Sequence, residues 1–285
     1  MFIATLVAKD RLSAGDISAA MDRLQGMAGL KLRLLREGKA VDIGFAGDPV
    51  AARTALEEQI DGVDVIIQRD ADRHRKLLVA DMDSTMITIE CIDELADYAG
   101  IKPQIAEVTE RAMRGELDFE EALRSRVALL AGLSADVVQQ CLRERVVVMP
   151  GARELVGQIH ANGGYAVLVS GGFTHFAEPV GELIGFDRVV ANQLGFTNGA
   201  LNGRVDGPIV GAQTKRETLF DVLAEKGWTV AESLAVGDGA NDIPMIEAAG
   251  LGVAYHAKPK TKAAAAASVS YGNLDAIAYA AGLKA

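Results

Sequence analysis

The feature that most constrains the fold is an apolar run that ends abruptly in acidic and hydroxyl side chains. Residues 76–80 read Lys-Leu-Leu-Val-Ala, and Asp81, Asp83, Ser84 and Thr85 follow directly. Such a run predicts a buried strand of a parallel sheet, and ligands bind beyond the carboxyl ends of such strands. Taken alone, an Asp-x-Asp pair favours a helix start, because Asp, Ser and Thr also cap helices. Further motifs along the chain reverse that preference.

Strand and helix patterns alternate from residue 75 to the end of the chain. The expected strands are 76–81, 165–170, 188–191, 233–237 and 251–254. This order predicts an α/β fold with a Rossmann-like, doubly wound parallel sheet. The dipeptide Asn198-Gly199 predicts a tight hairpin. The alanine-rich run 263–267 is expected to form a surface helix.

One long segment interrupts this alternation directly after the first strand. From Glu90 to about Arg145 the sequence carries helical patterns only. We expect a small helical bundle, inserted as a cap at about residues 88–147. Such a cap would hang over the strand end from which Asp81 and Asp83 emerge.

The first 72 residues have a different order of elements. Strand patterns at 2–8, 31–36, 40–46 and 63–68 and helical patterns at 13–25 and 49–60 give β-α-β-β-α-β. This is a ferredoxin-like order, and it resembles the small amino-acid-sensing ACT modules. The polar segment 69–75 predicts a linker, so the expected domains are 1–72, for regulation or dimerisation, and 73–285. The sequence leaves open whether the first domain binds an amino-acid effector such as serine and whether the chain is a homodimer.

Composition excludes several classes of protein. The 285 residues are 49% hydrophobic and 24% charged with a net charge of −10, which is typical of a globular protein and argues against a nucleic-acid partner. No uncharged run reaches membrane-spanning length, and the apolar N-terminus has no basic leader. Cys91 and Cys141 lie far apart, which suits reduced thiols. We therefore expect a cytoplasmic protein without a membrane partner.

Three later segments supply what phosphoryl transfer needs. At Ser170-Gly171-Gly172 an expected strand opens into a hydroxyl and glycine N–H groups that can approach phosphate oxygens closely. Lys215 opens a helix and could neutralise phosphate charge. A further strand ends in the run 237–242, which reads Gly-Asp-Gly-Ala-Asn-Asp. Its carboxylates favour a cation such as Mg²⁺, which binds carboxylate oxygens, phosphate and water.

In this order, the four motifs resemble those of the haloacid-dehalogenase superfamily of phosphatases, and within it the phosphoserine phosphatases. The similarity extends from about residue 76 to 283. It implies Mg²⁺-dependent hydrolysis of L-phosphoserine to L-serine and phosphate, the last step of serine biosynthesis. It also implies a Rossmann-like core with a mobile helical cap.

The resemblance assigns a role to each motif residue. Asp81 would be the nucleophile that forms an aspartyl-phosphate, and Asp83 would be the general acid and base. Lys215 would offset negative charge. The implied metal ligands are Asp81, the backbone of Asp83, Asp238 and Asp242. The implied holders of the phosphoryl oxygens are Ser170, Gly171, Lys215 and Asn241.

Substrate choice is expected to lie in the cap. There Arg126 could bind a carboxylate bidentately and Glu90 could accept from an ammonium group, a pair that fits a zwitterion. The resemblance lets Met113 and Phe119 close an apolar side around the substrate. Two alternatives remain: a phosphatase or phosphotransferase acting on another small phosphate ester, and a phosphoaspartate receiver domain of a signalling system.

Overall fold

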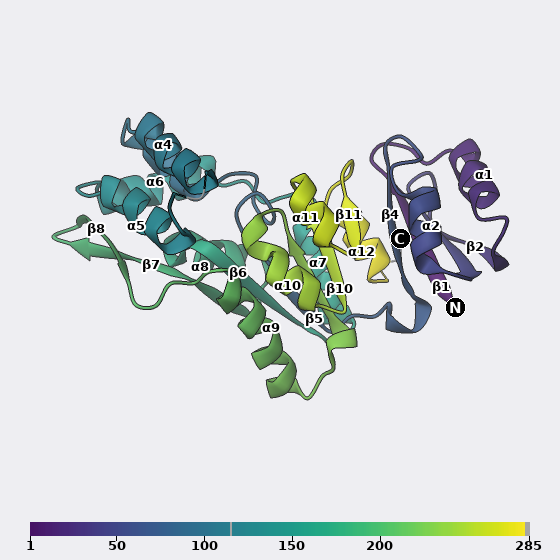
Figure 1. Cartoon of the computed structure of the whole chain (residues 1–285). Helices are drawn as coiled ribbons and strands as arrows, with labels where there is room; N and C mark the ends of the chain where they lie inside the picture. Colours follow the sequence, from purple (N-terminus) through teal and green to yellow (C-terminus); the bar gives the residue numbers. More distant parts are fainter. Residues whose placement is uncertain (115, 283–285) are drawn as a thin grey trace.

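The chain forms two β-sheets, shown in the computed structural model of Figure 1, which describes residues 1–114 and 116–282. A four-stranded antiparallel sheet near the N-terminus precedes a seven-stranded sheet that is mainly parallel. The expected α/β fold with a preceding ferredoxin-like sheet is confirmed. No helix among the described residues is both long and apolar enough to cross a membrane.

The N-terminal module, residues 2–69, has the expected β-α-β-β-α-β order. Its elements are β1 (Phe2–Ala8), α1 (Ala14–Arg23), β2 (Ala28–Arg36), β3 (Ala40–Ala46), α2 (Pro49–Leu56) and β4 (Val63–Arg69). Ser13 caps α1 and Asp48 caps α2 through side-chain oxygens, which satisfies free N–H groups at both helix starts. Alternate strand residues such as Leu6, Ile43 and Phe45 are buried in a core with these helices.

The larger sheet has the strand order β11-β10-β9-β5-β6-β7-β8. Its strands are β5 (Leu77–Ala80), β6 (Tyr165–Phe173), β7 (Arg188–Thr197), β8 (Ala200–Asp206), β9 (Ser233–Gly237), β10 (Leu251–Tyr255) and β11 (Ala267–Val269). All neighbours pair in parallel except β7 and β8, which form the expected hairpin at Asn198 and Gly199. Both turn residues have positive φ, 51° and 78°, as a tight hairpin turn requires. The short apolar run is thus a central strand, β5, between β6 and β9.

Helices cover both faces of this sheet. They are α7 (Ala152–Ala161), α8 (Thr174–Ile184), α9 (Ala212–Lys226), α10 (Ile243–Ala248), α11 (Pro259–Ala264) and α12 (Asp275–Ala280), with single-turn 3₁₀ helices at Asp70–Asp72, Val230–Glu232 and Ala240–Asp242. Leu78 and Ala80 pack with α7, α8 and α12, whereas Leu77 and Val79 pack with α9 and α10. Burial on both faces explains why β5 is apolar at every position.

The segment between β5 and β6 is helical, as expected. It contains α3 (Cys91–Tyr98), α4 (Lys102–Met113), α5 (Phe119–Leu129) and α6 (Ala135–Arg145), which we call the cap. The chain enters and leaves the cap side by side, where Ile87 bridges Val148 and the N–H of Met149 donates to the carbonyl of Met86 at 2.9 Å. Cys91 and Cys141 are free, buried thiols in the cap. The side chain of Met113 lies outside the described part of the chain.

The segment 69–75 is not the solvated linker that its polar sequence predicts. His74 is exposed, but the side chains of Arg73 and Arg75 are buried. Arg73 pairs with the carboxylate of Asp42 in β3 and donates to the carbonyl of Tyr279 in α12 at 2.7 Å. Arg75 donates to the side-chain oxygen of Gln68 in β4 at 3.1 Å and to the carbonyl of Ala231, so both arginines join the N-terminal module to the core. Charged residues are buried here because each finds a partner across the contact.

The end of the chain forms the other side of this contact. In Figure 1, α11, β11 and α12 (yellow) lie beside the N-terminal module. The carboxylate of Asp64 in β4 accepts three backbone N–H bonds of 2.7–3.1 Å from Ser270, Tyr271 and Gly272. The amide of Gln68 donates to the carbonyl of Ala280 at 2.7 Å. These contacts cover β1 and β4 on the face of the sheet that α1 and α2 leave free.

The expectation of a surface helix at 263–267 is wrong for most of that run. Helix α11 ends at Ala264, Ala265 and Ala267 are buried, and β11 begins at Ala267. Alanine favours a helix through local propensity, but an edge position beside β10 and burial against the N-terminal module decide the structure here.

Replacement of Asp42 tests the contact between the module and the core. Asp42→Asn removes the buried charge that faces Arg73, and we expect a loss of about 3 kcal/mol in the free energy of unfolding. Asp70→Asn is the matched control, because the Asp70 side chain is 51% exposed and lies 3.9 Å from Arg33; its effect should stay below about 0.5 kcal/mol. Urea unfolding followed by circular dichroism measures both. Equal losses would contradict a buried pair that holds the module in place.

Candidate active site

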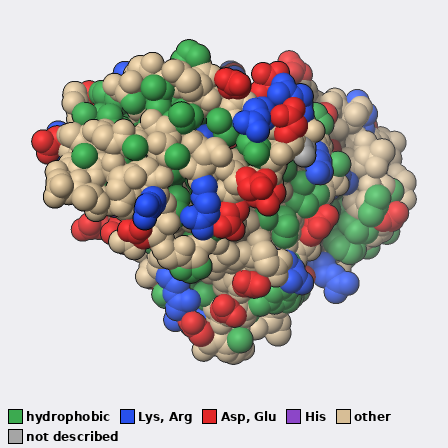
Figure 2. Space-filling model, turned by 60° about the vertical axis from the view of Figure 1, so that its left-hand side comes forward, with side chains coloured by type: hydrophobic (Ala, Val, Ile, Leu, Met, Phe, Trp, Pro, Cys, Tyr) green, Lys and Arg blue, Asp and Glu red, His purple; other side chains and the backbone are tan. Residues whose placement is uncertain are grey.

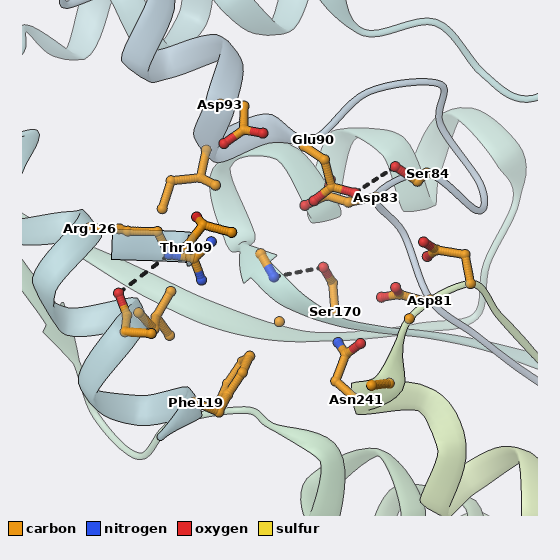
Figure 3. Close-up of a pocket in the computed structure, with 18 of the residues that line it drawn as sticks. Asp81, Asp83, Ser84, Glu90, Asp93, Thr109, Phe119, Arg126, Ser170 and Asn241 are labelled. Carbon is orange, nitrogen blue, oxygen red and sulfur yellow. Dashed lines mark hydrogen bonds between the residues drawn. The ribbon is translucent and has the colours of Figure 1, made fainter. Parts of the chain in front are cut away.

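The motif residues meet in one cavity between the cap and the carboxyl ends of the central strands. Figure 3 shows Arg126 and Thr109 at one end of the cavity and Asp81, Ser170 and Asn241 at the other. Its volume is about 610 Å³, which is in the range of small-molecule sites. The described lining residues include Asp81, Asp83, Ser84, Glu90, Ile92, Asp93, Thr109, Phe119, Arg126, Ser170, Gly171, Gly172, Asp238, Asn241 and Lys258.

Strand β5 delivers the first carboxylates to this cavity. Its four residues are fully buried, and Asp81 follows at the point where the chain leaves the sheet. The chain then turns sharply, with Ser84 at a φ of 56°, a conformation that costs energy in a residue other than glycine. The hydroxyl of Ser84 donates to Glu90 at 2.5 Å. This turn places Asp83 and Glu90 on the same side of the cavity.

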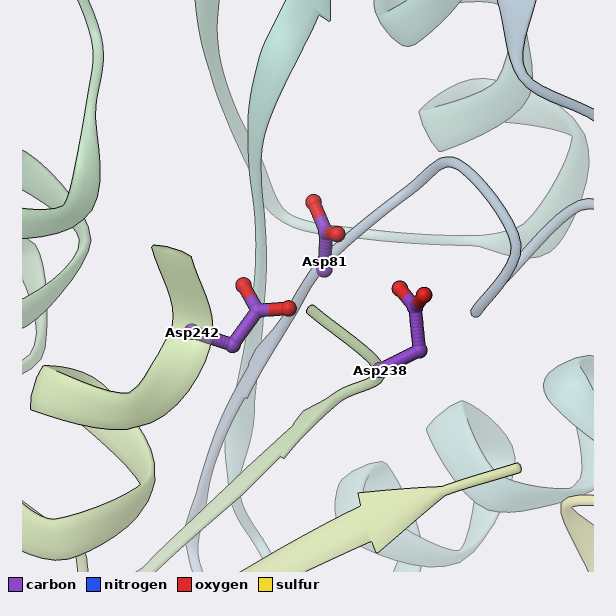
Figure 4. A group of neighbouring side chains, drawn as sticks. All are labelled: Asp81, Asp238 and Asp242. Atoms are coloured by element: carbon purple, nitrogen blue, oxygen red, sulfur yellow. The ribbon is translucent and has the colours of Figure 1, made fainter. Parts of the chain in front are cut away.

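Three aspartates from two adjacent strand ends form an acidic cluster (Figure 4). One carboxylate oxygen of each of Asp81, Asp238 and Asp242 lies within 4.8 Å of the others. Asp242 can lie there because Gly237 has no side chain; an added Cβ would come within 2.3 Å of the Asp242 carboxyl carbon. The cluster offers only oxygen donors, the set that Mg²⁺ prefers. These residues could therefore hold a divalent cation.

Lys215 is the buried counter-charge of this cluster. Its ammonium is fully buried and lies 2.5 Å from Asp81 and 2.6 Å from Asp242. Although burial alone would lower it, the pKa of Lys215 is raised by these carboxylates. Burial and the charge of Asp242 raise the pKa of Asp81, and burial and Asp242 raise the pKa of Asp238 to about 6. One ammonium thus faces three carboxylates, and the excess negative charge favours a bound cation.

Asp83 is suited to carry a proton at neutral pH. Burial, and then the charge of Glu90, raise its pKa to about 7. Its Oδ1 atom is buried and has no hydrogen-bond partner within the described residues. Gly172 lies opposite, and an added Cβ there would come within 3.0 Å of Oδ2. A carboxyl group in this environment can donate a proton and later accept one.

Polar donors surround the space next to Asp81. The hydroxyl of Ser170 accepts from the N–H of Gly172 at 2.8 Å, which fixes its position at the end of the strand run. Asn241 lines the same space from the 3₁₀ helix Ala240–Asp242. Such prefixed donors suit oxygens that carry developing negative charge.

The cap forms the other wall. Arg126 in α5 is mostly buried, which lowers its pKa, and its Nε donates to the carbonyl of Ala122 at 3.3 Å. Phe119 is the first residue of α5, and its ring lies against the core loops. An added Cβ at Gly171 or Gly211 would come within 3.2 or 3.3 Å of this ring. The structure therefore brings Glu90, Phe119 and Arg126 together with the core motifs. Lys215 lies behind Asp81, and the side chain of Met113 lies outside the described part of the chain.

The sequence of the chain also matches a known family of enzymes. Residues 78–247, more than half of the chain, match the model of the haloacid dehalogenase-like hydrolases. The chain belongs to this family.

Relatives of this hydrolase include a phosphoserine phosphatase of Vibrio cholerae, 47% identical over 201 residues that make up 70% of this chain and 61% of that protein. The chain thus spans under two thirds of that relative. A crystal structure of a probable phosphoserine phosphatase from Vibrio cholerae, unliganded, has a TM-score of 0.80 at 38% identity and covers 98% of this chain and 86% of that one. A phospho-aspartyl intermediate analogue of a phosphoserine phosphatase has a TM-score of 0.67 at 36% identity and covers 71% of this chain and 97% of that one.

Several contributors to the hydrolase site escaped sequence reasoning. Asn192 in β7 is buried, and its side chain bonds to Gly171 and to both backbone groups of Val210, so it ties two site loops together. A polar residue at the end of an expected strand was its only signal. Thr85 donates to Asp238 at 3.2 Å. Lys258 lines the cavity from outside every motif, and nothing in its local sequence marks it.

The acidic cluster predicts unequal effects on metal affinity. Asp238→Asn removes a cluster carboxylate and should weaken Mg²⁺ binding by about 10–100-fold, whereas Asp83→Asn should change it little, because the proposed metal contact of Asp83 is a backbone oxygen. Isothermal titration with MgCl₂ measures both variants. Equal loss of affinity in the two would contradict this division of roles.

Proposed function

We propose that this hydrolase converts L-phosphoserine to L-serine and phosphate with Mg²⁺, the last step of serine biosynthesis. The observation that carries the proposal is the pairing of two ends in one cavity. Asp81 and Asp83 stand at the phosphotransfer end with Glu90 beside Asp83, while Arg126 offers the opposite charge to Glu90 from the cap end. Relatives named phosphoserine phosphatases support it.

In the first step, Asp81 attacks phosphorus in line and forms an aspartyl-phosphate. The bond from phosphorus to the seryl oxygen breaks, and Asp83 gives its proton to that oxygen. A raised pKa of about 7 lets a useful fraction of Asp83 carry this proton at neutral pH. Serine then leaves with a free hydroxyl group.

In the second step, water attacks the same phosphorus. Asp83, now ionised, takes a proton from that water, and the bond between phosphorus and Asp81 breaks to release phosphate. Ser170, Gly171 and Asn241 hold the phosphoryl oxygens in both steps. Because these donors are held in place beforehand, little reorganisation is needed as charge develops.

The cation would be held by Asp81, Asp238, Asp242 and the backbone oxygen of Asp83. When bound, Mg²⁺ supplies positive charge that offsets the repulsion between carboxylates and phosphate. Asp242 also accepts from the N–H of Gly239 at 2.9 Å and from Lys215. We therefore assign Asp242 to positioning Lys215 as well as to the cation.

Recognition of the amino acid falls to the cap. Arg126 has a mostly buried guanidinium that forms no ion pair among the described residues, and it can bind the substrate carboxylate through two N–H donors. Glu90 can accept from the substrate ammonium, and Phe119, together with Met113, would close the apolar side. Sugar phosphates carry neither group, which disfavours them. A long-lived phosphoaspartate signal is disfavoured by an acid and base as close as Asp83.

For the N-terminal module we propose dimerisation through β2 and keep the expected domain limits of 1–72 and 73–285, with the cap at about 88–147. Strand β2 is an edge strand, and its Leu32 and Leu34 are 52% and 63% exposed. An apolar edge of this kind pairs readily with a second copy. An amino-acid effector at this module remains a proposal from the resemblance alone.

Replacement of Arg126 tests substrate identity. Arg126→Ala should lower kcat/KM for phosphoserine by roughly two to three orders of magnitude, because a charge-assisted bidentate contact is lost. Hydrolysis of p-nitrophenyl phosphate, which has no carboxylate, should change much less. Arg124→Ala is the control, since Arg124 lies on the same helix and pairs with Glu120 at the surface. An equal fall for both esters would reduce the claim to an unspecified phosphate ester.

Replacement of Asp81 tests the nucleophile. Asp81→Asn should abolish phosphate release from every ester while the protein stays folded, since Lys215 keeps its bond to Asp242. Phosphate release and thermal melting are measured on the same sample. Appreciable turnover by the purified variant would refute the assignment.

A further inference from the structure

The lining of the cavity has the same sign of charge as the proposed phosphate ester substrate. Its described lining includes five acidic side chains, Asp81, Asp83, Glu90, Asp93 and Asp238. A phosphate monoester arrives largely as a dianion, so this lining repels it. Some positive charge must be free at the cavity to attract the phosphate group before it reaches the cation site.

The two functional cations already discussed are not free for this task. Lys215 is fully buried and held by Asp81 and Asp242. Arg126 is mostly buried in the cap wall, at the opposite end of the cavity from Asp81. Neither is placed to meet a phosphate group that enters from solvent.

Lys258 is the other basic residue among the described lining residues. Its side chain is exposed and makes no hydrogen bond or ion pair within the part of the chain that the structure describes. Basic and acidic side chains are interspersed on the face shown in Figure 2, so surface lysines commonly have acidic neighbours. A lysine that lines an acidic cavity and is itself unpaired is available to an anion.

The backbone at Lys258 is held in place although its side chain is free. Lys258 directly precedes α11. This helix follows the carboxyl end of β10, on the side of the sheet where the carboxyl ends of β5 and β9 also lie. At the far end of α11, Arg53 of the N-terminal module donates to the carbonyl of Ala265 at 2.7 Å, and Lys262 pairs with Glu58 at 3.0 Å. Thr261, which lies between Lys258 and Lys262, is buried. The module therefore anchors the helix that carries Lys258.

We propose that Lys258 is a phosphate-recruiting residue: its ammonium draws the phosphate group of the ester into the acidic cavity and contacts inorganic phosphate there. This inference rests on the proposed phosphatase activity. It does not depend on which alcohol forms the phosphate ester. Lys258 acts on the charge of the phosphate group, so it serves any dianionic ester. It is a positioning residue, because the bonds that form and break are those at Asp81.

This role predicts a specific kinetic pattern. Steering by an exposed charge raises the rate of productive encounter and weakens as salt screens it. Loss of the charge should therefore lower kcat/KM at low ionic strength, lower it less at high ionic strength, and leave kcat nearly unchanged. A purely structural role would lower stability or kcat without any dependence on salt.

The test compares Lys258→Gln, Lys258→Arg and Lys260→Gln in the full chain. Lys260 is the matched control: it is exposed on α11, two residues further on, and is not among the described lining residues. We expect Lys258→Gln to lower kcat/KM about tenfold at low salt for both phosphoserine and p-nitrophenyl phosphate. Lys258→Arg should keep most of the activity, and Lys260→Gln should match the unchanged protein.

Inorganic phosphate gives a readout that does not depend on turnover. Calorimetric titration in the presence of Mg²⁺ should show weaker phosphate binding to Lys258→Gln than to Lys260→Gln. If phosphoserine proves not to be the substrate, this difference and the effect on p-nitrophenyl phosphate should persist. Equal behaviour of the two glutamine variants, or a loss of kcat/KM that does not vary with salt, would overturn the proposal.

Discussion

The buried ammonium of Lys215 is the interaction on which the site depends. It lies 2.5 Å from Asp81 and 2.6 Å from Asp242, and it offsets the negative charge of these two buried side chains. Because α9 supplies the ammonium while β5 and the turn after β9 supply the carboxylates, this contact also fixes the core elements around the cavity. The site still has more negative than positive charge, which favours a bound cation. The same excess is the reason why we propose a role for a further lysine, Lys258, at the cavity.

Much of the core and of the site could be predicted because parallel strands impose a simple rule. The ends of β5, β6 and β9 lie at one edge of the sheet, so Asp81, Ser170 and Asp238 had to come together once the strands were placed. The cap residues Glu90 and Arg126 were less predictable from the sequence itself, because a surface helix carries the same charges. Asn192 and Lys258 were missed, and Thr85 was given no role although it lies in the first motif, since these roles arise from tertiary contacts that leave no local pattern.

The contact between the N-terminal module and the core shows where local sequence reasoning fails. A run of charges at 69–75 is typical of a solvated linker, yet Arg73 and Arg75 are buried. The partners of Arg73 lie 31 and 206 residues away in the chain, and one partner of Arg75 lies 156 residues away. The alanine run at 263–267 was assigned by helix propensity, whereas pairing with β10 and cover by the module decide its structure. Both errors have one cause: the module is packed on the chain's last segment, and the sequence of neither part reveals the other.

The central claim is that Asp81 carries the phosphoryl group during turnover. The most direct measurement is rapid quenching of the unmodified enzyme with phosphoserine and Mg²⁺, followed by mass spectrometry of its peptides after trapping of the acyl phosphate with hydroxylamine. We expect a modified residue at Asp81, formed at least as fast as phosphate is released. Label at Asp83 or at a hydroxyl residue, or phosphate release without any modified aspartate, would contradict it.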